Sequence, residues 1–325
     1  MQTQEQIIDF LNRELESRAY FTGFKPDELY EPINYVLANG GKRIRPLLLL
    51  ASYNLFKDNL SEAIDAALAI EVFHNFTLLH DDIMDKSPMR RNKPTVHMKW
   101  NENIAILSGD AMLIKAYHLL ANIDQRKLKD VLDEFNKVAL EVCEGQQYDM
   151  NFETIPQITE AEYIGMIRLK TAVLFASCMK IGAILAEAHP PQIESLYQVG
   201  LNFGISFQLQ DDLLDAFGDE NQLGKRIGND IVSNKKTFLM IKSLELANNI
   251  QNEEINRLMS GYLSDEEKIS GMLAIYEELN IKEITEQNIL SYNNQIFEAI
   301  AKLKVDEKRK STLLDIANKL LKRKK

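Results

Sequence analysis

Two acidic clusters constrain this chain more than any other feature of its sequence. Each has the pattern DDxxD and ends an apolar stretch with helical spacing. The six residues are Asp81, Asp82, Asp85, Asp211, Asp212 and Asp215. Residues four apart lie on one face of a helix, so the outer aspartates of each cluster can point the same way. Neighbouring carboxylates repel one another, and the dipole at the C-terminal end of a helix also disfavours them. Helix stability therefore explains neither cluster, whereas a bound divalent cation explains both.

The rest of the chain is typical of helices. Apolar residues recur at helical spacing, and no strand or βαβ pattern is found. Only 8 prolines and 14 glycines interrupt the 325 residues, so long helices are expected. The length predicts one large or two ordinary domains. The predicted helices cover about 3–18, 30–39, 47–56, 62–85, 102–122, 126–150, 160–186, 192–217, 234–249, 252–262, 264–279, 281–303 and 307–322.

Composition narrows the possible partners and the compartment. The net charge of −10 argues against nucleic acid as a partner. No run approaches the ~18 apolar residues of a membrane-spanning helix, and the start of the chain lacks the pattern of a signal peptide. Cys143 and Cys178 lie in apolar helical stretches, which favours buried free thiols and a reducing compartment. We therefore expect a cytoplasmic protein with no membrane span.

Basic residues gather at two turns. The run 42–46, Lys-Arg-Ile-Arg-Pro, follows Gly40-Gly41 and precedes a predicted helix whose first amides favour an anion. This turn is either a solvated surface turn or an anion site. Arg90 and Arg91 stand side by side after the first acidic cluster. They form either plain salt bridges or a clamp for a diphosphate.

The acidic clusters and the basic turns together indicate diphosphate chemistry. Carboxylate oxygens suit magnesium, which keeps waters and binds substrate phosphates. Magnesium, Arg and Lys together stabilise a leaving diphosphate. The absence of a GxxxxGK[ST] loop argues against an ordinary nucleotide hydrolase. The apolar helices before the clusters favour a hydrophobic substrate tail.

A Glu-x-x-His pair, Glu71 and His74, matches half of a di-iron bundle signature. A di-iron site needs a second such pair, and the sequence offers none. We therefore interpret His74 as a core residue or a phosphate contact.

The sequence resembles the trans isoprenyl diphosphate synthases of the polyprenyl synthetase family. The resemblance runs from about residue 25 to 240 and is specific in the order and spacing of its motifs. The matching pieces are the GGKRIRP run at 40–46, the stretch 80–97, Gly109-Asp110, Gly145-Gln146, Lys170-Thr171-Ala172, the stretch 207–215, and 224–235. Asn92 stands where the family often has Gly, and Asn tolerates the left-handed conformation that such a loop needs.

The resemblance implies an all-α isoprenoid synthase fold: a single domain over residues 1–325, a helical bundle around a deep central cavity, assembled as a homodimer. It implies a prenyltransferase that condenses an allylic diphosphate with isopentenyl diphosphate. About three magnesium ions would assist ionisation of the allylic substrate, and the released diphosphate would then remove the final proton.

The resemblance also implies a role for each site residue. Asp81 and Asp85 would hold two metal ions and Asp211 the third, with Asp82, Asp212 and Asp215 as supporting ligands. The allylic diphosphate would be held by Arg90, Lys170, Lys225 and Lys235. Thr171, Gln208 and the backbone carbonyl of Lys170 would face the developing cation. Isopentenyl diphosphate would be held by Lys42, Arg45, His74 and Arg91.

Product length is expected to depend on the helix before the first cluster. Phe76 lies five residues before Asp81, roughly 7.5 Å along a helix. Thr77 is small. In the family, an aromatic residue at the fifth position alone favours twenty carbons, and the cluster lacks the two-residue insertion of bacterial fifteen-carbon synthases. We expect a geranylgeranyl diphosphate synthase, with farnesyl diphosphate synthase next. Alternatively, Phe76 is core packing and Phe73, Met112 or a partner subunit closes the pocket.

Two other functions are consistent with parts of the pattern. A terpene cyclase uses the same chemistry on the same kind of bundle, but it has no use for the second basic site at Lys42 and Arg45. A non-catalytic subunit of a prenyl synthase has no need of two intact acidic clusters.

Overall fold

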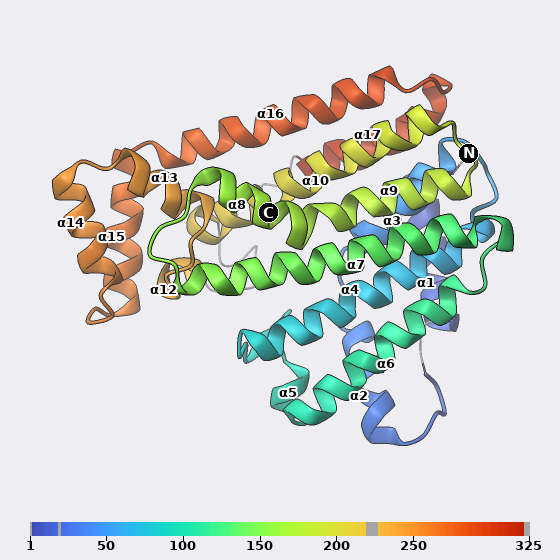
Figure 1. Cartoon of the computed structure of the whole chain (residues 1–325), viewed down its shortest axis with the longest axis horizontal. Coiled ribbons are helices and arrows are strands. Elements are labelled where there is room, and N and C mark those ends of the chain that lie inside the picture. The colour runs from blue at the N-terminus through green and yellow to red at the C-terminus, as the bar shows by residue number, and fades with distance from the viewer. Residues whose placement is uncertain (1, 19–20, 219–226, 322–325) are drawn as a thin grey trace. The chain divides into compact units, whose positions relative to one another are not determined.

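The protein is helical along almost its whole length in the computed structural model, which describes residues 2–18, 21–218 and 227–321 (Figure 1). The predicted all-α class is confirmed. The helices are α1 (Gln4–Arg18), α2 (Asp27–Ala38), α3 (Ile44–Asn54), η1 (Leu60–Glu62), α4 (Ile64–Met84), α5 (Val96–Lys99), α6 (Glu102–Leu120), α7 (Gln125–Thr154), α8 (Glu160–Ile167), η2 (Arg168–Ala172), α9 (Val173–Leu185), α10 (Pro190–Phe217), α12 (Asn229–Val232), α13 (Phe238–Leu246), α14 (Asn249–Met259), α15 (Asp265–Glu278), α16 (Ile281–Lys302) and α17 (Glu307–Leu321).

Two differences from the sequence prediction have local causes. The helix predicted from residue 234 begins at Phe238, because Thr237 caps it by accepting a hydrogen bond from the Met240 amide. A short antiparallel hairpin, β1 (Met89–Arg90) and β2 (Lys93–Pro94), was not predicted. Strands of two residues are too short for alternation to show in the sequence.

The chain divides into two compact units. The first unit comprises Met1–Lys137, Ser177–Tyr197 and Lys302–Ile316, and the second comprises Val138–Ala176, Gln198–Ala301 and Ala317–Lys325. The single domain expected over the whole chain, with its central cavity, stays a prediction. Among the described residues, no helix is both long enough and apolar enough to cross a membrane.

In the first unit, α4 is the central helix. It packs against α1, α2, α3 and α6, the last of which runs alongside it in Figure 1. Its residues from Ile64 to Phe73 are buried apart from Asp65, and three alanines among them allow neighbouring helices to approach closely. This packing fixes the last turns of α4, where the first acidic cluster lies.

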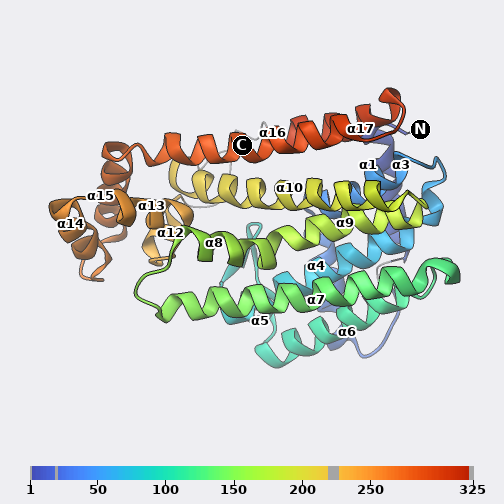
Figure 2. The ribbon, with the colours of Figure 1, turned by 45° about the horizontal axis from the view of Figure 1, so that its top comes forward.

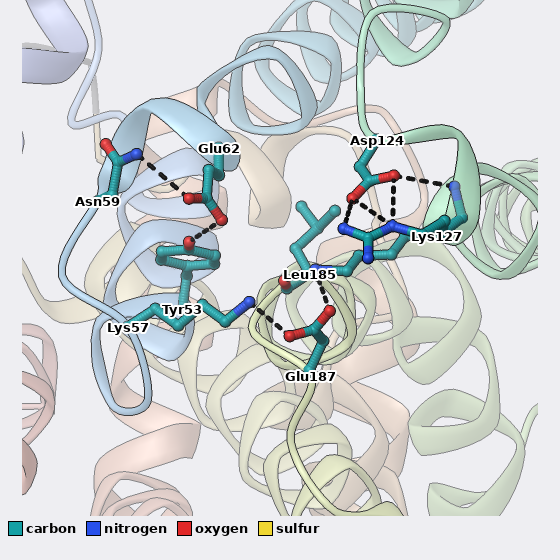
Figure 3. A network of polar contacts seen from close by, with 9 residues as sticks. Tyr53, Lys57, Asn59, Glu62, Asp124, Lys127, Leu185 and Glu187 are labelled. Atoms are coloured by element: carbon teal, nitrogen blue, oxygen red, sulfur yellow. Dashed lines mark hydrogen bonds and ion pairs between the residues drawn. The ribbon is translucent and has the colours of Figure 1, made fainter.

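A polar network joins α3, η1, α7 and α9 at another place in the first unit (Figure 3). Glu62 accepts hydrogen bonds from Tyr53 at 2.8 Å and Asn59 at 3.2 Å. Glu187 lies between Lys57 at 2.7 Å and Lys127 at 3.1 Å. We call these side chains the Glu62–Glu187 network; Glu62 lies between two neutral donors and Glu187 between two lysines.

In the second unit, the 198–217 part of α10 lies along α16 in both views (Figures 1 and 2). The buried hydroxyl of Ser206 donates to Asn293 at 2.6 Å across this contact. Helices α8 and α9 are joined without a break by η2, a π-helical turn. These elements carry the second acidic cluster and the Lys170–Thr171 pair.

Candidate active site

A tight turn places the first basic residues before α3. Gly40, Gly41 and Arg43 all have positive φ, at 72°, 134° and 47°. An added Cβ at Gly41 would lie 3.0 Å from the Arg91 guanidinium, a tight contact, and the φ of 134° would strain any residue with a side chain. This basic turn, residues 40–45, therefore favours glycine where Arg91 crosses it.

Three of the four residues expected to hold isopentenyl diphosphate meet at this turn, in the first unit. Arg45 Nη1 lies 2.9 Å from His74 Nε2 on α4, and Arg91 donates to the Gly40 carbonyl. The fourth, Lys42, is exposed on the turn itself. Burial, then the positive charge of Arg45 and the neighbouring arginines, holds the pKa of His74 well below its usual value. The imidazole is therefore neutral and can accept from Arg45.

The β1–β2 hairpin separates the two adjacent arginines. Its two loop residues, Arg91 and Asn92, have φ values of 52° and 60°, as a tight hairpin turn requires. The left-handed conformation expected for Asn92 is confirmed. Arg91 is directed to the basic turn, whereas Arg90, on β1, is directed to Asp82 at 2.7 Å. Of the two interpretations of Arg90, the structure contains the salt bridge; its contact with a diphosphate stays a prediction.

The first acidic cluster has three different environments at the end of α4. Asp81 is half-buried, Asp82 is buried and Asp85 is exposed. Burial raises the pKa of Asp82 to about 6, although Arg90 opposes this shift. The outer two aspartates keep contact with solvent, which suits residues that exchange water for a metal.

In the second acidic cluster, in the second unit, Asp212 accepts hydrogen bonds from three neutral donors. Asp212 is buried and accepts from the Tyr163 hydroxyl, from Gln208 Nε2 at 3.1 Å and from the Phe238 amide at 3.4 Å. Burial and the nearby Asp230 raise its pKa to about 7, although Tyr163 opposes the shift. Asp215 is also buried.

Residues Gly228 and Asp230 contact the end of this cluster. Asp215 accepts from the Asp230 amide at 2.9 Å, and its carbonyl accepts from the Gly228 amide at 2.7 Å. The Lys235 amide donates to the Asp230 carbonyl at 2.9 Å, which fixes the backbone that carries this exposed lysine. Lys225, the other lysine expected here, lies outside the described residues.

The residues expected to face the cation lie on and beside the π-helical turn η2. Thr171 donates to Gln208 at 3.1 Å, and Gln208 in turn donates to Asp212. Lys170 forms an ion pair with Asp149 at 2.6 Å. A Cβ at Gly145 would lie 2.2 Å from the Lys170 backbone nitrogen, so only glycine lets α7 approach this turn. π-Helical turns are frequent at functional sites, and this one carries Lys170 and Thr171.

The aspartates have the right chemistry for magnesium, since their oxygens are hard ligands. Within 2–18, 21–218 and 227–321, no three His, Cys, Asp or Glu side chains are already arranged around a common metal position. Glu71, half of the possible di-iron motif, pairs instead with Arg43. Metal binding by the six aspartates stays a prediction.

Aromatic rings line the helix before the first cluster. The half-buried Phe76 contacts the rings of His80 and Phe73, with centroids 4.7 Å and 5.7 Å away. Phe73 is buried and contacts Phe135 at 5.1 Å. The hydroxyl of Thr77 donates to the His74 carbonyl at 2.9 Å. Phe76 is thus supported by Phe73, which in turn contacts Phe135. The role of Phe76 in product length stays a prediction.

Sequence reasoning missed the partners of the expected residues. Asp149 pairs with Lys170, Tyr163 holds Asp212, Asp230 closes on Asp215, and Glu71 binds Arg43. Of these four, only Glu71 gave a signal, and that signal was a metal motif that did not apply.

The chain is similar to known proteins over most of its length. The model of the polyprenyl synthetase family matches residues 26–279. A short chain isoprenyl diphosphate synthase of Methanocaldococcus jannaschii is 40% identical over 252 residues, 77% of each chain. A crystal structure of a geranylgeranyl pyrophosphate synthase, 41% identical, covers 100% of both chains with a TM-score of 0.94. A geranylgeranyl pyrophosphate synthase of Corynebacterium glutamicum, solved with isoprenyl diphosphate and magnesium, is 28% identical, covers 98% of this chain and 97% of its own, and has a TM-score of 0.85.

The all-α fold and these motifs define a prenyltransferase of isoprenoid biosynthesis. The chain belongs to the polyprenyl synthetase family.

Proposed function

We propose that this protein is a geranylgeranyl diphosphate synthase. It condenses an allylic diphosphate with isopentenyl diphosphate to give a twenty-carbon product. The observation that carries the proposal is the meeting of Arg45, His74 and Arg91 at the basic turn, in the same unit as the first acidic cluster. A second diphosphate site of this kind is needed for a condensation and is superfluous for a cyclase.

The proposed roles follow from the chemistry of each group. Asp81, Asp85 and Asp211 hold about three magnesium ions, which, when bound, polarise the leaving diphosphate. The allylic diphosphate is bound by the positive charges of four side chains, those of Arg90, Lys170, Lys225 and Lys235.

Oxygen atoms stabilise the developing allylic cation. These are Thr171 Oγ1, Gln208 Oε1 and the Lys170 carbonyl, all dipoles without a negative charge that could trap the cation. The hydrogen bond from Thr171 to Gln208 holds two of them together. The π-helical turn supports the third, because a turn of this type changes the bonding of its carbonyl groups. The double bond of isopentenyl diphosphate attacks the cation and forms the new carbon–carbon bond, and the departing diphosphate accepts the proton that is lost as the new double bond forms.

The product length rests on Phe76. Its ring is half-buried and contacts Phe73, which restricts its movement. Phe76 is therefore suited to close the end of the pocket and limit the length of the product. Two of the solved relatives are geranylgeranyl pyrophosphate synthases. Farnesyl diphosphate is the alternative product that we consider second.

A homodimer is supported by an apolar strip on α6. Leu107, Ile114 and Tyr117 are 60%, 69% and 37% exposed and lie at helical spacing on one side. A second copy of the chain would cover this strip and remove it from water. The cytoplasmic location stays a prediction. Cys143 and Cys178 are both free thiols, and Cys178 is buried as expected, whereas Cys143 is exposed, so its predicted burial is wrong.

The test is product analysis. Purified protein is incubated with magnesium, isopentenyl diphosphate and labelled allylic primers, and the products are dephosphorylated and weighed by mass spectrometry. A twenty-carbon alcohol is expected. Cyclic hydrocarbons indicate a cyclase, and absence of turnover supports a non-catalytic subunit.

The same assay on three variants tests the pocket floor. Phe76→Ala is expected to lengthen the product, whereas Phe73→Leu and Met112→Ala leave the length unchanged. If Phe73→Leu or Met112→Ala gives longer products while Phe76→Ala gives products of wild-type length, the residue changed in that variant closes the pocket instead of Phe76.

A further inference from the structure

Two arginines near the expected isopentenyl diphosphate site have left-handed backbone. They are Arg43, with φ of 47°, and Arg91, with φ of 52°. For residues with a side chain this conformation is unfavourable and persists only where the surroundings enforce it. The hairpin enforces it at Arg91. Arg43 immediately precedes α3, where its carbonyl accepts from the Leu47 amide at 3.1 Å, and its side-chain contacts add to this backbone bond.

The side chain of Arg43 turns inward, away from its neighbour. Its side chain is only 9% exposed, whereas Lys42 is exposed. Arg43 donates to the Leu37 carbonyl at 2.6 Å and forms an ion pair with Glu71, whose side chain is 3% exposed. One guanidinium therefore ties the basic turn to the end of α2 and to α4.

Glu71 is itself fixed within α4. Its carboxylate accepts from Asn75 Nδ2 at 2.8 Å, and the same amide donates to the Glu71 carbonyl at 2.8 Å. Glu71 also lies one turn before His74, which contacts Arg45 at 2.9 Å. Glu71 and His74, one turn apart on α4, thus hold Arg43 and Arg45 of the basic turn.

We propose that Glu71, acting through Arg43 and supported by Asn75, is a positioning residue that holds residues 40–45 in the conformation that binds isopentenyl diphosphate. Glu71 contacts no substrate. It secures the strained backbone at Arg43, so that Lys42 and Arg45 face the diphosphate on either side of it. The inference rests on the proposed function of the site and assigns a role to a residue that motif reasoning connected only with iron.

The experiment compares two buried ion pairs of the same unit. Glu71→Gln keeps the shape and one acceptor oxygen but removes the charge that holds Arg43. The matched control is Glu134→Gln, whose carboxylate is 4% exposed and pairs with Lys180 at 2.6 Å and Ser177 at 2.6 Å. Both variants lose a buried ion pair, so both are expected to melt at lower temperature.

Only Glu71→Gln is expected to raise the KM for isopentenyl diphosphate, by about tenfold, with the KM for the allylic primer little changed. Arg43→Lys keeps the charge but cannot bond both Glu71 and Leu37, so a smaller rise is expected. An unchanged KM in Glu71→Gln, or equal rises for both substrates in both variants, would overturn the proposal.

Hydrogen exchange gives a readout that does not depend on turnover. Amides of residues 40–45 are expected to exchange faster in Glu71→Gln than in wild type, and at the wild-type rate in Glu134→Gln. If Glu71→Gln does not fold, the same measurement on Arg43→Lys decides, and unchanged exchange there overturns the inference. A wild-type protein that fails to condense isopentenyl diphosphate refutes the proposed function instead, since the exchange of the turn is then still measurable.

Discussion

Charged side chains gather at two places in the first unit, and the two arrangements are opposite. In the Glu62–Glu187 network, each carboxylate lies between donors (Figure 3). Hydrogen bonds from Lys57 and Lys127 lower the pKa of Glu187 to about 2. Around the basic turn, burial lowers the pKa of His74, and the charges of Arg45, Arg91, Arg90 and Arg43 lower it further.

The difference shows which charges serve stability and which serve binding. In the network, each carboxylate is matched by donors, and these contacts join the elements that carry it. Around the basic turn, Arg43 and Arg90 are also paired, with Glu71 and Asp82, yet four guanidinium groups act on one imidazole, which favours the approach of an anion. We therefore propose the basic turn as a site for a multivalent anion, with contacts such as the Arg43–Glu71 pair holding its cations together.

The largest expected effect is found by comparing the loss of one basic side chain from the basic turn with the loss of one from the Glu62–Glu187 network. Arg45→Ala should raise the KM for isopentenyl diphosphate at least roughly tenfold, because a charged contact to the diphosphate is lost. Lys57→Ala should leave both KM values unchanged. Steady-state kinetics on both variants checks this; equal kinetic effects would remove the distinction between the two regions.

A smaller effect is expected from inorganic pyrophosphate. Bound at one hundred times its Kd, a ligand stabilises by about 2.7 kcal/mol, or several degrees in the melting temperature of a chain this size. Scanning calorimetry should show this shift in wild type and in Glu187→Gln, weaker at high salt. Arg45→Ala should show much less of it. A full shift in Arg45→Ala would place the anion elsewhere.

The smallest effect is the acid sensitivity of the Glu62–Glu187 network. The pKa of Glu187 is lower in the folded protein than its ordinary 4.5. Its contribution to stability is thus present above pH 4.5 and is lost as the pH falls from 4.5 towards about 2. The difference in melting temperature between wild type and Glu187→Gln, a few degrees at most because the pair is exposed, should vanish over this interval. A difference that is constant with pH would show that the ion pairs contribute nothing.

Sequence reasoning succeeded where a pattern repeats along one element. The helices and both acidic clusters were predictable, because periodicity and spacing are local properties. The left-handed Asn92 agreed with the family resemblance, because Asn stands where the family often has Gly and tolerates that conformation. The role of Phe76 in product length stays a prediction, and its ring contacts could not be read from its position.

What escaped prediction depends on contacts between distant segments. Nothing in the run 42–46 says that Arg43 turns inward and Lys42 outward, because a turn has no fixed period. Tyr163 and Asp212 stand far apart in the sequence and meet only through the packing of α8 on neighbouring helices. Such partners become visible only when the three-dimensional structure is known.

The π-helical turn at Arg168–Ala172 sets a constraint on how this enzyme can change. Each residue of an α-helix advances the direction of the side chains by roughly 100°. Val173 to Ala176 are all buried and face every side of the helix, so deleting one residue here would rotate each of them into a neighbour shaped for a different side chain. Evolution can exchange side chains at this joint, but a change of its length would require the whole following segment to be repacked.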